Sequence, residues 1–136
     1  MLQSGTYKWY LTQYIETARE VGAIPVLVTP VSRLYYTNDG TIKPHHDSTD
    51  TTTGTLVTEN NAYVEAVKQL AKEQNVLLID GFEITKNMYE EAYKADEKAA
   101  NGKSVNGMQV MSAGDSTHSN KLGGFITAEL FAQQIQ

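Results

Sequence analysis

Apolar residues recur every three or four positions in four stretches of the chain, which is the spacing of a helix with one buried face. The first stretch begins after Thr6, a residue type that caps helices, and it ends at Gly22, a residue type that stops them. Its apolar stripe predicts that Tyr10 and Tyr14 are buried, and the stripe of the last stretch predicts the same for Leu122. The four predicted helices span residues 7–22, 59–74, 83–100 and 120–135.

Two continuous apolar runs, residues 24–30 and 76–81, lie between these helices. Such runs predict strands covered on both faces, as in parallel sheets, and helices that alternate with them predict an α/β domain. Two strands are few for such a domain. Either further strands lie in the loop at residues 34–58, within the polar stretch 32–58, or strands of the fold lie upstream of Tyr7, outside this chain. Within the polar stretch, Asn38-Asp39-Gly40 predicts a turn around which a short hairpin can form.

The composition favours a single domain over residues 1–136, because 136 residues with 40% apolar side chains build one core. Sixteen acidic residues against eleven basic ones leave a net charge of −5, which argues against nucleic acid or an anionic membrane as a partner. No apolar run approaches the ~20 residues of a membrane-spanning helix, and the first six residues carry no targeting signal. The absence of cysteine excludes disulfides, zinc-thiolate sites and cysteine nucleophiles.

The segment with the most specific chemistry lies just before the last predicted helix and reads Asp115-x-x-His118-x-Asn120-x-x-Gly123. A carboxylate beside a histidine fixes the imidazole tautomer and stabilises the imidazolium, while the other ring nitrogen faces a serine hydroxyl. Asn120 is suited to cap the following helix, and Gly123 permits close packing of its first turn. The alternative interpretation is structural: Asp115 forms an Asx-type turn, and His118 is a solvated loop residue.

The Asp115–His118 segment resembles the C-terminal catalytic block of the SGNH, or GDSL-type, hydrolase superfamily. The chain looks more closely like rhamnogalacturonan acetylesterases, through residues 6–23, 24–33, 63–80 and 114–135. The resemblance implies a three-layer α/β/α, flavodoxin-like fold, of which this chain is the C-terminal part. It also implies that Asp115 and His118 are the acid and base of a Ser-His-Asp triad, that the substrate is an acetylated pectin-type polysaccharide, and that no cofactor is required. An extracellular location is suggested by the resemblance alone.

The resemblance places the nucleophilic serine and the oxyanion-hole glycine and asparagine of the family upstream of Tyr7, outside this chain. Two similar strings do not replace them. Ser116 lies in a GDS-like string, but it is two residues from His118 and no strand-to-helix turn is predicted around it. Asn38-Asp39 resembles part of a G-x-N-D motif, but Tyr36 stands where the glycine belongs. We therefore expect the chain by itself to be inactive as an esterase.

Three residues after the first predicted strand are candidates for substrate binding. The rings of Tyr35 and Tyr36 are suited to stack on a sugar, and Arg33 is suited to pair with a sugar carboxylate, although a surface ion pair is an equal alternative for Arg33. His45-His46-Asp47, with Asp50 nearby, offers ligands for a divalent metal. Neighbouring side chains point apart in an extended loop, so a polar surface loop is favoured and no metal site is assigned.

The residues leave three functions open. The favoured one is the C-terminal part of an esterase, and the others are a non-catalytic oligomerising or binding module with a vestigial Asp115-x-x-His118 and a metal-binding protein that uses His45 and His46. In the complete fold that the resemblance implies, the strand at 24–29 pairs with a strand upstream of Tyr7. Without that neighbour its N–H and C=O groups form an open edge, through which we expect the chain to self-associate.

Overall fold

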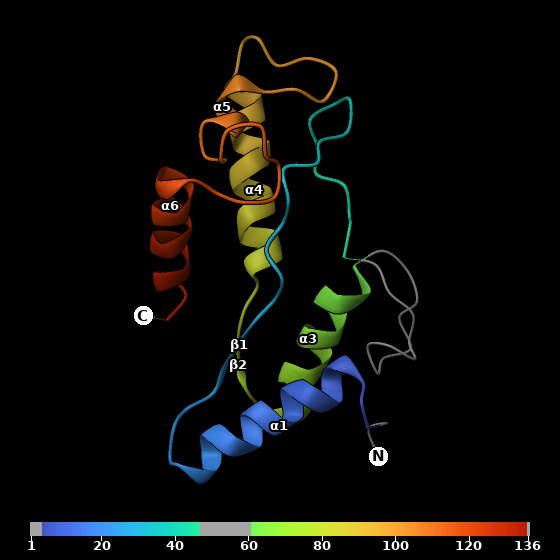
Figure 1. Ribbon diagram of the computed structural model, residues 1–136, viewed down its shortest axis with the longest axis vertical. Coiled ribbons are helices and arrows are strands. Elements are labelled where there is room, and N and C mark those ends of the chain that lie inside the picture. Colours follow the sequence, from blue (N-terminus) through green and yellow to red (C-terminus); the bar gives the residue numbers. More distant parts are fainter. Residues whose placement is uncertain (1–3, 47–60, 136) are drawn as a thin grey trace. The chain divides into compact units, whose positions relative to one another are not determined.

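The protein is represented by a computed structural model that describes residues 4–46 and 61–135 (Figure 1). The described chain divides into two compact units. The first unit contains residues 4–30, 44–46 and 61–80, and the second contains residues 31–43 and 81–135. The single domain expected over residues 1–136 stays a prediction. Across the described ranges, each helix is too short or too polar to cross a membrane.

Two helices and a two-stranded parallel sheet form the first unit (Figure 1). The elements are α1 (Tyr7–Glu20), β1 (Val26–Val28), α3 (Ala62–Gln74) and β2 (Leu77–Ile79). The strands pair in parallel with Val26 opposite Leu77. Both strands lie inside the predicted apolar runs, and the predicted α/β class with a short parallel sheet is confirmed.

The core of the first unit lies where α1 packs against α3 and where α3 covers the sheet. Its residues are apolar and almost fully buried: Ile15, Leu27, Val67, Leu70 and Ala71, with Tyr7, Leu11 and Val76 packed around them. The predicted cap of α1 is confirmed, because the Thr6 side chain accepts a hydrogen bond from the Trp9 amide at 3.3 Å.

The buried face of α1 differs from the predicted one. Tyr10 and Tyr14 are 54% and 73% exposed, whereas Lys8 and Thr12 are buried beside the core. Burial of a lysine requires a partner for its charge, and the Lys8 ammonium lies 2.8 Å from a carboxylate oxygen of Glu73 on α3. This ion pair allows Lys8 to be buried, so the buried face of α1 is rotated about the helix axis from the face that the apolar residues predicted.

The second unit contains α4 (Gly81–Lys94), α5 (Val105–Met108) and α6 (Lys121–Ala132). The third predicted helix ends at Lys94 rather than at residue 100 because Asp96 makes competing bonds. Its Oδ1 accepts from the Lys98 amide at 3.0 Å, and its Oδ2 accepts from the Val105 amide at 2.6 Å. These bonds turn the chain out of α4 and into α5, a four-residue helix that is too short for periodicity to predict.

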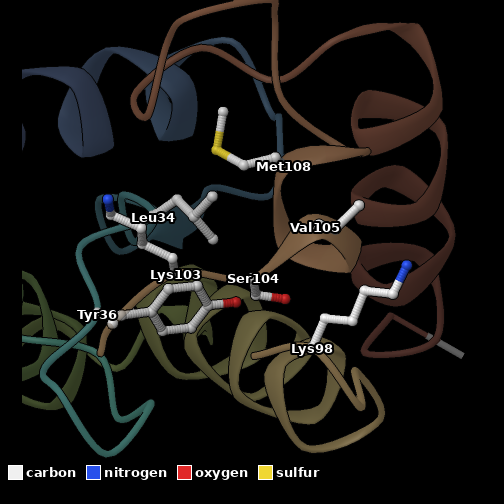
Figure 2. Close-up of a pocket in the computed structure, with 8 residues that line it drawn as sticks. Leu34, Tyr36, Lys98, Lys103, Ser104, Val105 and Met108 are labelled. Carbon is white, nitrogen blue, oxygen red and sulfur yellow. The ribbon is translucent and has the colours of Figure 1, made fainter. Parts of the chain in front are cut away.

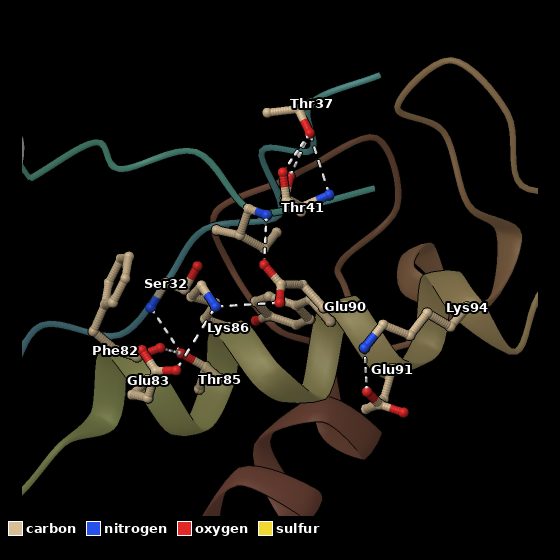
Figure 3. A network of polar contacts seen from close by, with 12 residues as sticks. Ser32, Thr37, Thr41, Phe82, Glu83, Thr85, Lys86, Glu90, Glu91 and Lys94 are labelled. Atoms are coloured by element: carbon tan, nitrogen blue, oxygen red, sulfur yellow. Dashed lines mark hydrogen bonds and ion pairs between the residues drawn. The ribbon is translucent and has the colours of Figure 1, made fainter. Parts of the chain in front are cut away.

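The segment at residues 31–43 is fastened along α4 by polar contacts (Figure 3). The Ser32 amide donates to the Thr85 hydroxyl at 2.8 Å, and the Ile42 amide donates to a Glu90 carboxylate oxygen at 2.8 Å. Between them lies the predicted turn, closed by a bond of 3.1 Å from the Gly40 amide to the Thr37 carbonyl. Gly40 has φ +88°, and a Cβ there would lie 2.2 Å from the Tyr93 ring, so the turn requires glycine.

The core of the second unit is formed by α4, the loop before α6 and this segment. Its buried members are Leu34, Tyr36, Ile42, Tyr89, Val110 and Met111, with Met88, Tyr93 and Ile126 against them. The predicted burial of Leu122 on α6 is wrong, since its side chain is 51% exposed. The first turn of α6 approaches its neighbours through Gly123 instead, which is buried.

Candidate active site

The loop between α5 and α6 carries Asp115 and His118 and doubles back as a narrow hairpin. Met111 forms an antiparallel bridge with Ser119, and the Ser112 amide donates to the His118 carbonyl at 2.9 Å. The Asp115 amide then donates to the Ser112 carbonyl at 3.0 Å. Short-range bonds of this kind hold the two arms of the hairpin together around the residues from Asp115 to His118.

Asn120 closes the base of this hairpin. Its Oδ1 accepts from the Gly123 amide at 3.0 Å, which confirms the predicted cap of α6, and its Nδ2 donates to the carbonyls of Gln109 and Met111 at 2.7 and 2.9 Å. The predicted close packing at Gly123 is also present, because a Cβ there would lie 2.1 Å from the Val110 carbonyl oxygen. The first turn of α6 is therefore hydrogen-bonded to the loop and packed closely against it.

Asp115 and His118 form a hydrogen-bonded pair. One carboxylate oxygen of Asp115 lies 2.6 Å from His118 Nδ1, and the other accepts from the Thr117 and His118 amides at 2.6 and 3.1 Å. The bond from the Thr117 amide, followed by that from the His118 ring, lowers the pKa of the Asp115 carboxyl to about 2, so the group is ionised at neutral pH. The Asx-type turn of the structural interpretation is present as well.

The carboxylate sets the tautomer of the histidine. An ionised carboxylate only accepts, so Nδ1 carries the proton and Nε2 keeps its lone pair when the ring is neutral. The His118 side chain is 78% exposed. In the part of the chain that the structure describes, no hydrogen bond to Nε2 is present. The pair therefore offers an unoccupied basic nitrogen to its surroundings.

Two curated proteins of Bacillus subtilis (strain 168) are similar to the chain over nearly its full length. The probable rhamnogalacturonan acetylesterase YesY is 38% identical over 133 residues, and the rhamnogalacturonan acetylesterase RhgT is 32% identical over 140 residues. The matches cover 96% of this chain in both cases. The chain is similar, over nearly its full length, to proteins named as rhamnogalacturonan acetylesterases. The resemblance found in the sequence is thus confirmed.

The chain spans about half the length of these relatives, 51% of YesY and 52% of RhgT. Among solved structures, the crystal structure of the protein YxiM from Bacillus subtilis matches with a TM-score of 0.66 and 21% identity. That match covers 94% of this chain and 30% of YxiM, and it supports the fold alone. No protein-family model matches the chain.

Arg33 and Tyr35 lie beside the loop that carries Asp115 and His118. The Leu34 amide between them donates to the Ser116 carbonyl at 2.8 Å. Arg33 Nη1 lies 3.4 Å from the Tyr35 hydroxyl, and hydrogen bonds with Arg33 and then Thr117 lower the pKa of the Tyr35 phenol. The structure brings these two candidates to the loop that carries the pair, and their role in substrate binding stays a prediction.

Tyr36 points away from this loop. Its side chain is 8% exposed, and its hydroxyl donates to the Tyr89 carbonyl at 2.6 Å. Desolvation by burial raises the pKa of this phenol. Its ring belongs to the core of the second unit and also lines a cavity. A sugar could contact the Tyr36 ring from that cavity, and the role of Tyr36 in substrate binding stays a prediction.

The two strings set aside in the sequence have structural roles. Ser116 contributes a hydrogen bond to the Tyr35 phenol, and within residues 61–135 its hydroxyl makes no bond to the His118 ring. Asp39 accepts from the Thr41 amide and hydroxyl at 3.2 and 2.9 Å inside the turn of the second unit. Neither residue is placed as a nucleophile or as an oxyanion donor.

The metal-site alternative involves residues that are only partly described. Asp47 and Asp50 lie outside the described residues. The rings of His45 and His46 have centroids 4.4 Å apart, and the amides of both residues donate to Asn61 Oδ1 at 3.1 and 3.3 Å. Among residues 4–46 and 61–135, no group of three histidine, aspartate or glutamate side chains is arranged to hold a metal ion.

Proposed function

We propose that the chain supplies the acid and base of a serine acetylesterase that acts on acylated, pectin-type polysaccharide. In this proposal Asp115 is the acid and His118 the base of a Ser-His-Asp triad. The observation that carries the proposal is the 2.6 Å contact between the Asp115 carboxylate and His118 Nδ1, in a chain 38% and 32% identical to proteins named as rhamnogalacturonan acetylesterases. The nucleophilic serine and the oxyanion donors come from residues outside this chain.

The free Nε2 of His118 defines the chemistry. The serine oxygen adds to the acetyl carbonyl carbon while Nε2 accepts the serine proton. The tetrahedral adduct then loses the sugar oxygen, which takes that proton and leaves as a hydroxyl, and acetyl-serine remains. Water attacks the acetyl-serine while Nε2 accepts its proton, and the collapse of the second adduct releases acetate and returns the proton to serine. Asp115, with its pKa near 2, stays ionised throughout and stabilises the imidazolium.

The direct test grafts this chain in place of the matched segment of RhgT and measures acetate release from acetylated rhamnogalacturonan. RhgT is chosen because its name states the activity without qualification. An active graft supports the proposal. A folded graft that binds a serine-directed fluorophosphonate but releases no acetate contradicts it.

The chain alone should be inactive. We expect no labelling by a fluorophosphonate and no hydrolysis of 4-nitrophenyl acetate above that of its own His118→Ala variant, because no described serine hydrogen-bonds to Nε2. The measurement is intact-protein mass spectrometry with a parallel absorbance assay. Stoichiometric labelling at Ser116, with activity that Ser116→Ala removes, would show that the nucleophile lies inside the chain.

The second candidate function, an oligomerising module, is favoured by the exposed apolar side chains of the sheet. Val26, Val28 and Leu77 are 37%, 42% and 62% exposed, although parallel strands are normally covered on both faces. In the described residues β1 and β2 pair only with each other, so each also has one open edge. We therefore propose that the chain self-associates through this sheet.

Light scattering at micromolar concentration should give a mass of twice the 15.0 kDa of the chain. Val28→Lys should shift the mass to that of a monomer, because a charged side chain on an open sheet edge opposes strand pairing. Leu122→Lys, at an exposed apolar residue of α6, is the matched control and should leave the mass unchanged. A wild-type monomer that folds cooperatively would exclude self-association.

A further inference from the structure

The backbone of Tyr35 is fixed on both sides within the second unit. Its amide donates to the Arg33 carbonyl at 2.9 Å, and its carbonyl accepts from the Lys43 amide at 2.9 Å. The neighbouring side chains, Leu34 and Tyr36, line a cavity of the same unit (Figure 2). The Tyr35 side chain is turned the other way, toward the loop between α5 and α6.

The segment that carries Tyr35 is bonded directly to the Asp-His loop, residues 115–118. The Leu34 amide donates to the Ser116 carbonyl at 2.8 Å, between the two residues of the candidate pair. The same segment is anchored to α4, because the Ser32 amide donates to a threonine hydroxyl of that helix at 2.8 Å. Backbone bonds therefore place Tyr35 beside the loop independently of its own hydroxyl group.

The hydroxyl of Tyr35 links its own segment to the loop. Arg33 Nη1 lies 3.4 Å from this hydroxyl, and the guanidinium carbon lies 5.8 Å from the centre of the tyrosine ring. The side chains of Thr117 and Ser116 also make hydrogen bonds with the hydroxyl. A phenol can donate and accept at the same time, so it can bond to partners on both sides. The Arg33 side chain thus orients the ring, and the ring holds the two loop residues.

Thr117 connects this tyrosine to the candidate pair. Its amide donates to Asp115 Oδ1 at 2.6 Å, and this bond is the largest cause of the lowered pKa of the Asp115 carboxyl. The other oxygen of the same carboxylate lies 2.6 Å from His118 Nδ1. Asp115 and Thr117 are only half-buried, so water competes for the bond between them. The bond therefore depends on contacts that hold Thr117 in place.

We propose that Tyr35 is a positioning residue for the pair of Asp115 and His118, an inference that rests on the proposed function. Its hydroxyl holds Thr117 so that the Thr117 amide stays bonded to Asp115. Asp115 in turn keeps the proton of His118 on Nδ1. This role differs from the sugar contact that the sequence suggested for Tyr35, because the hydroxyl acts on the pair and not on the substrate.

The first test measures hydrogen exchange of the Thr117 amide in the ¹⁵N-labelled chain. Tyr35→Phe removes the hydroxyl and keeps the ring, and it should speed this exchange by about three- to tenfold, the factor that one ordinary hydrogen bond is worth. The ring ¹⁵N signals of His118 should move toward those of a free histidine. Tyr93→Phe removes a phenol hydroxyl that donates to the Asn38 carbonyl in the same unit, and it should change the exchange by less than twofold.

Thr117→Val tests whether Tyr35 acts through Thr117. This variant loses the partner hydroxyl and keeps the shape of the side chain, so it should speed the exchange of the residue 117 amide as Tyr35→Phe does. In the double variant, Tyr35→Phe should add less than twofold to the effect of Thr117→Val, because two changes that break one contact are not additive. The dispersion of the amide spectrum shows whether Tyr35→Phe folds, and Thr117→Val alone tests the bond if it does not.

Kinetics of the RhgT graft separate positioning from substrate binding. Tyr35→Phe should lower kcat by about three- to tenfold and leave KM within twofold, because a misplaced base slows the reaction of bound substrate. A raised KM at unchanged kcat would overturn the proposal, since Tyr35 would then be a substrate contact. Unchanged exchange of the Thr117 amide, or additive effects in the double variant, would also overturn it. The exchange is measured without ester turnover, so an inactive graft counts against the proposed function alone.

Discussion

His118→Ala in the RhgT graft is expected to lower kcat by about 10⁴-fold or more, the size of effect seen when the base of a serine triad is removed. Such a factor corresponds to about 5.5 kcal/mol of transition-state stabilisation. The structural reason is that Nε2 of this ring is the only basic nitrogen that the described loop presents, and Asp115 holds its tautomer through a 2.6 Å contact. Asp115→Asn should cost about 10³- to 10⁴-fold, because an amide can donate to Nδ1 and stabilise the wrong tautomer.

Acetate release under saturating substrate measures both effects, and the unmodified graft is the reference. His45→Ala removes a histidine from the first unit, whereas the Asp-His loop belongs to the second, and is expected to stay within twofold of the reference. Labelling of the unmodified graft by a fluorophosphonate establishes that its serine site is assembled, and circular dichroism shows whether each variant graft folds. A folded His118→Ala graft that keeps a tenth of the activity would remove His118 from the mechanism.

The parts of this structure that the sequence predicted well are those fixed by local bonds. The Thr6 cap, the Gly40 turn and the Asn120 cap each depend on one side chain and on amides within four residues, and all three are present. The Asp115–His118 contact is of the same kind, since the bonds that position it come from within the hairpin. The contact between Asp115 and His118 could therefore be predicted from the local sequence.

Tertiary contacts decided what the sequence did not predict. The buried face of α1 follows the Lys8–Glu73 ion pair, which joins residues 65 positions apart, and apolar periodicity contains no sign of it. The end of α4 follows Asp96, whose partners on α5 lie nine and ten residues further on. The cavity beside Tyr36 needs residues 34 and 36 against residues 98–108, a meeting of two distant segments with no shared motif.

Gly123→Ala is expected to destabilise the chain by about 1–3 kcal/mol, whereas Gly124→Ala should stabilise it by about 0.5–1 kcal/mol. The two glycines are neighbours in the first turns of α6, so the substitutions have the same effect on helix propensity and on the unfolded chain. The two positions differ in the room available for a side chain. A Cβ at Gly123 would lie 2.1 Å from the Val110 carbonyl oxygen and 3.0 Å from Ser119 Cβ, whereas a Cβ at Gly124 has no atom within 4 Å.

The clash that Gly123→Ala introduces also affects the candidate site, because α6 must move away from Val110 to make room for the Cβ. The Val110 carbonyl accepts the Asn120 amide at 3.0 Å, and Asn120 closes the hairpin that holds Asp115 against His118. Urea unfolding followed by circular dichroism measures the stability difference, and ¹⁵N shifts of the His118 ring report whether Nδ1 still donates to Asp115. Gly124→Ala should leave the ring signals unchanged, and Gly123→Ala should shift them toward those of a free histidine. If both variants are stabilised equally, the contact between α6 and Val110 does not position the pair.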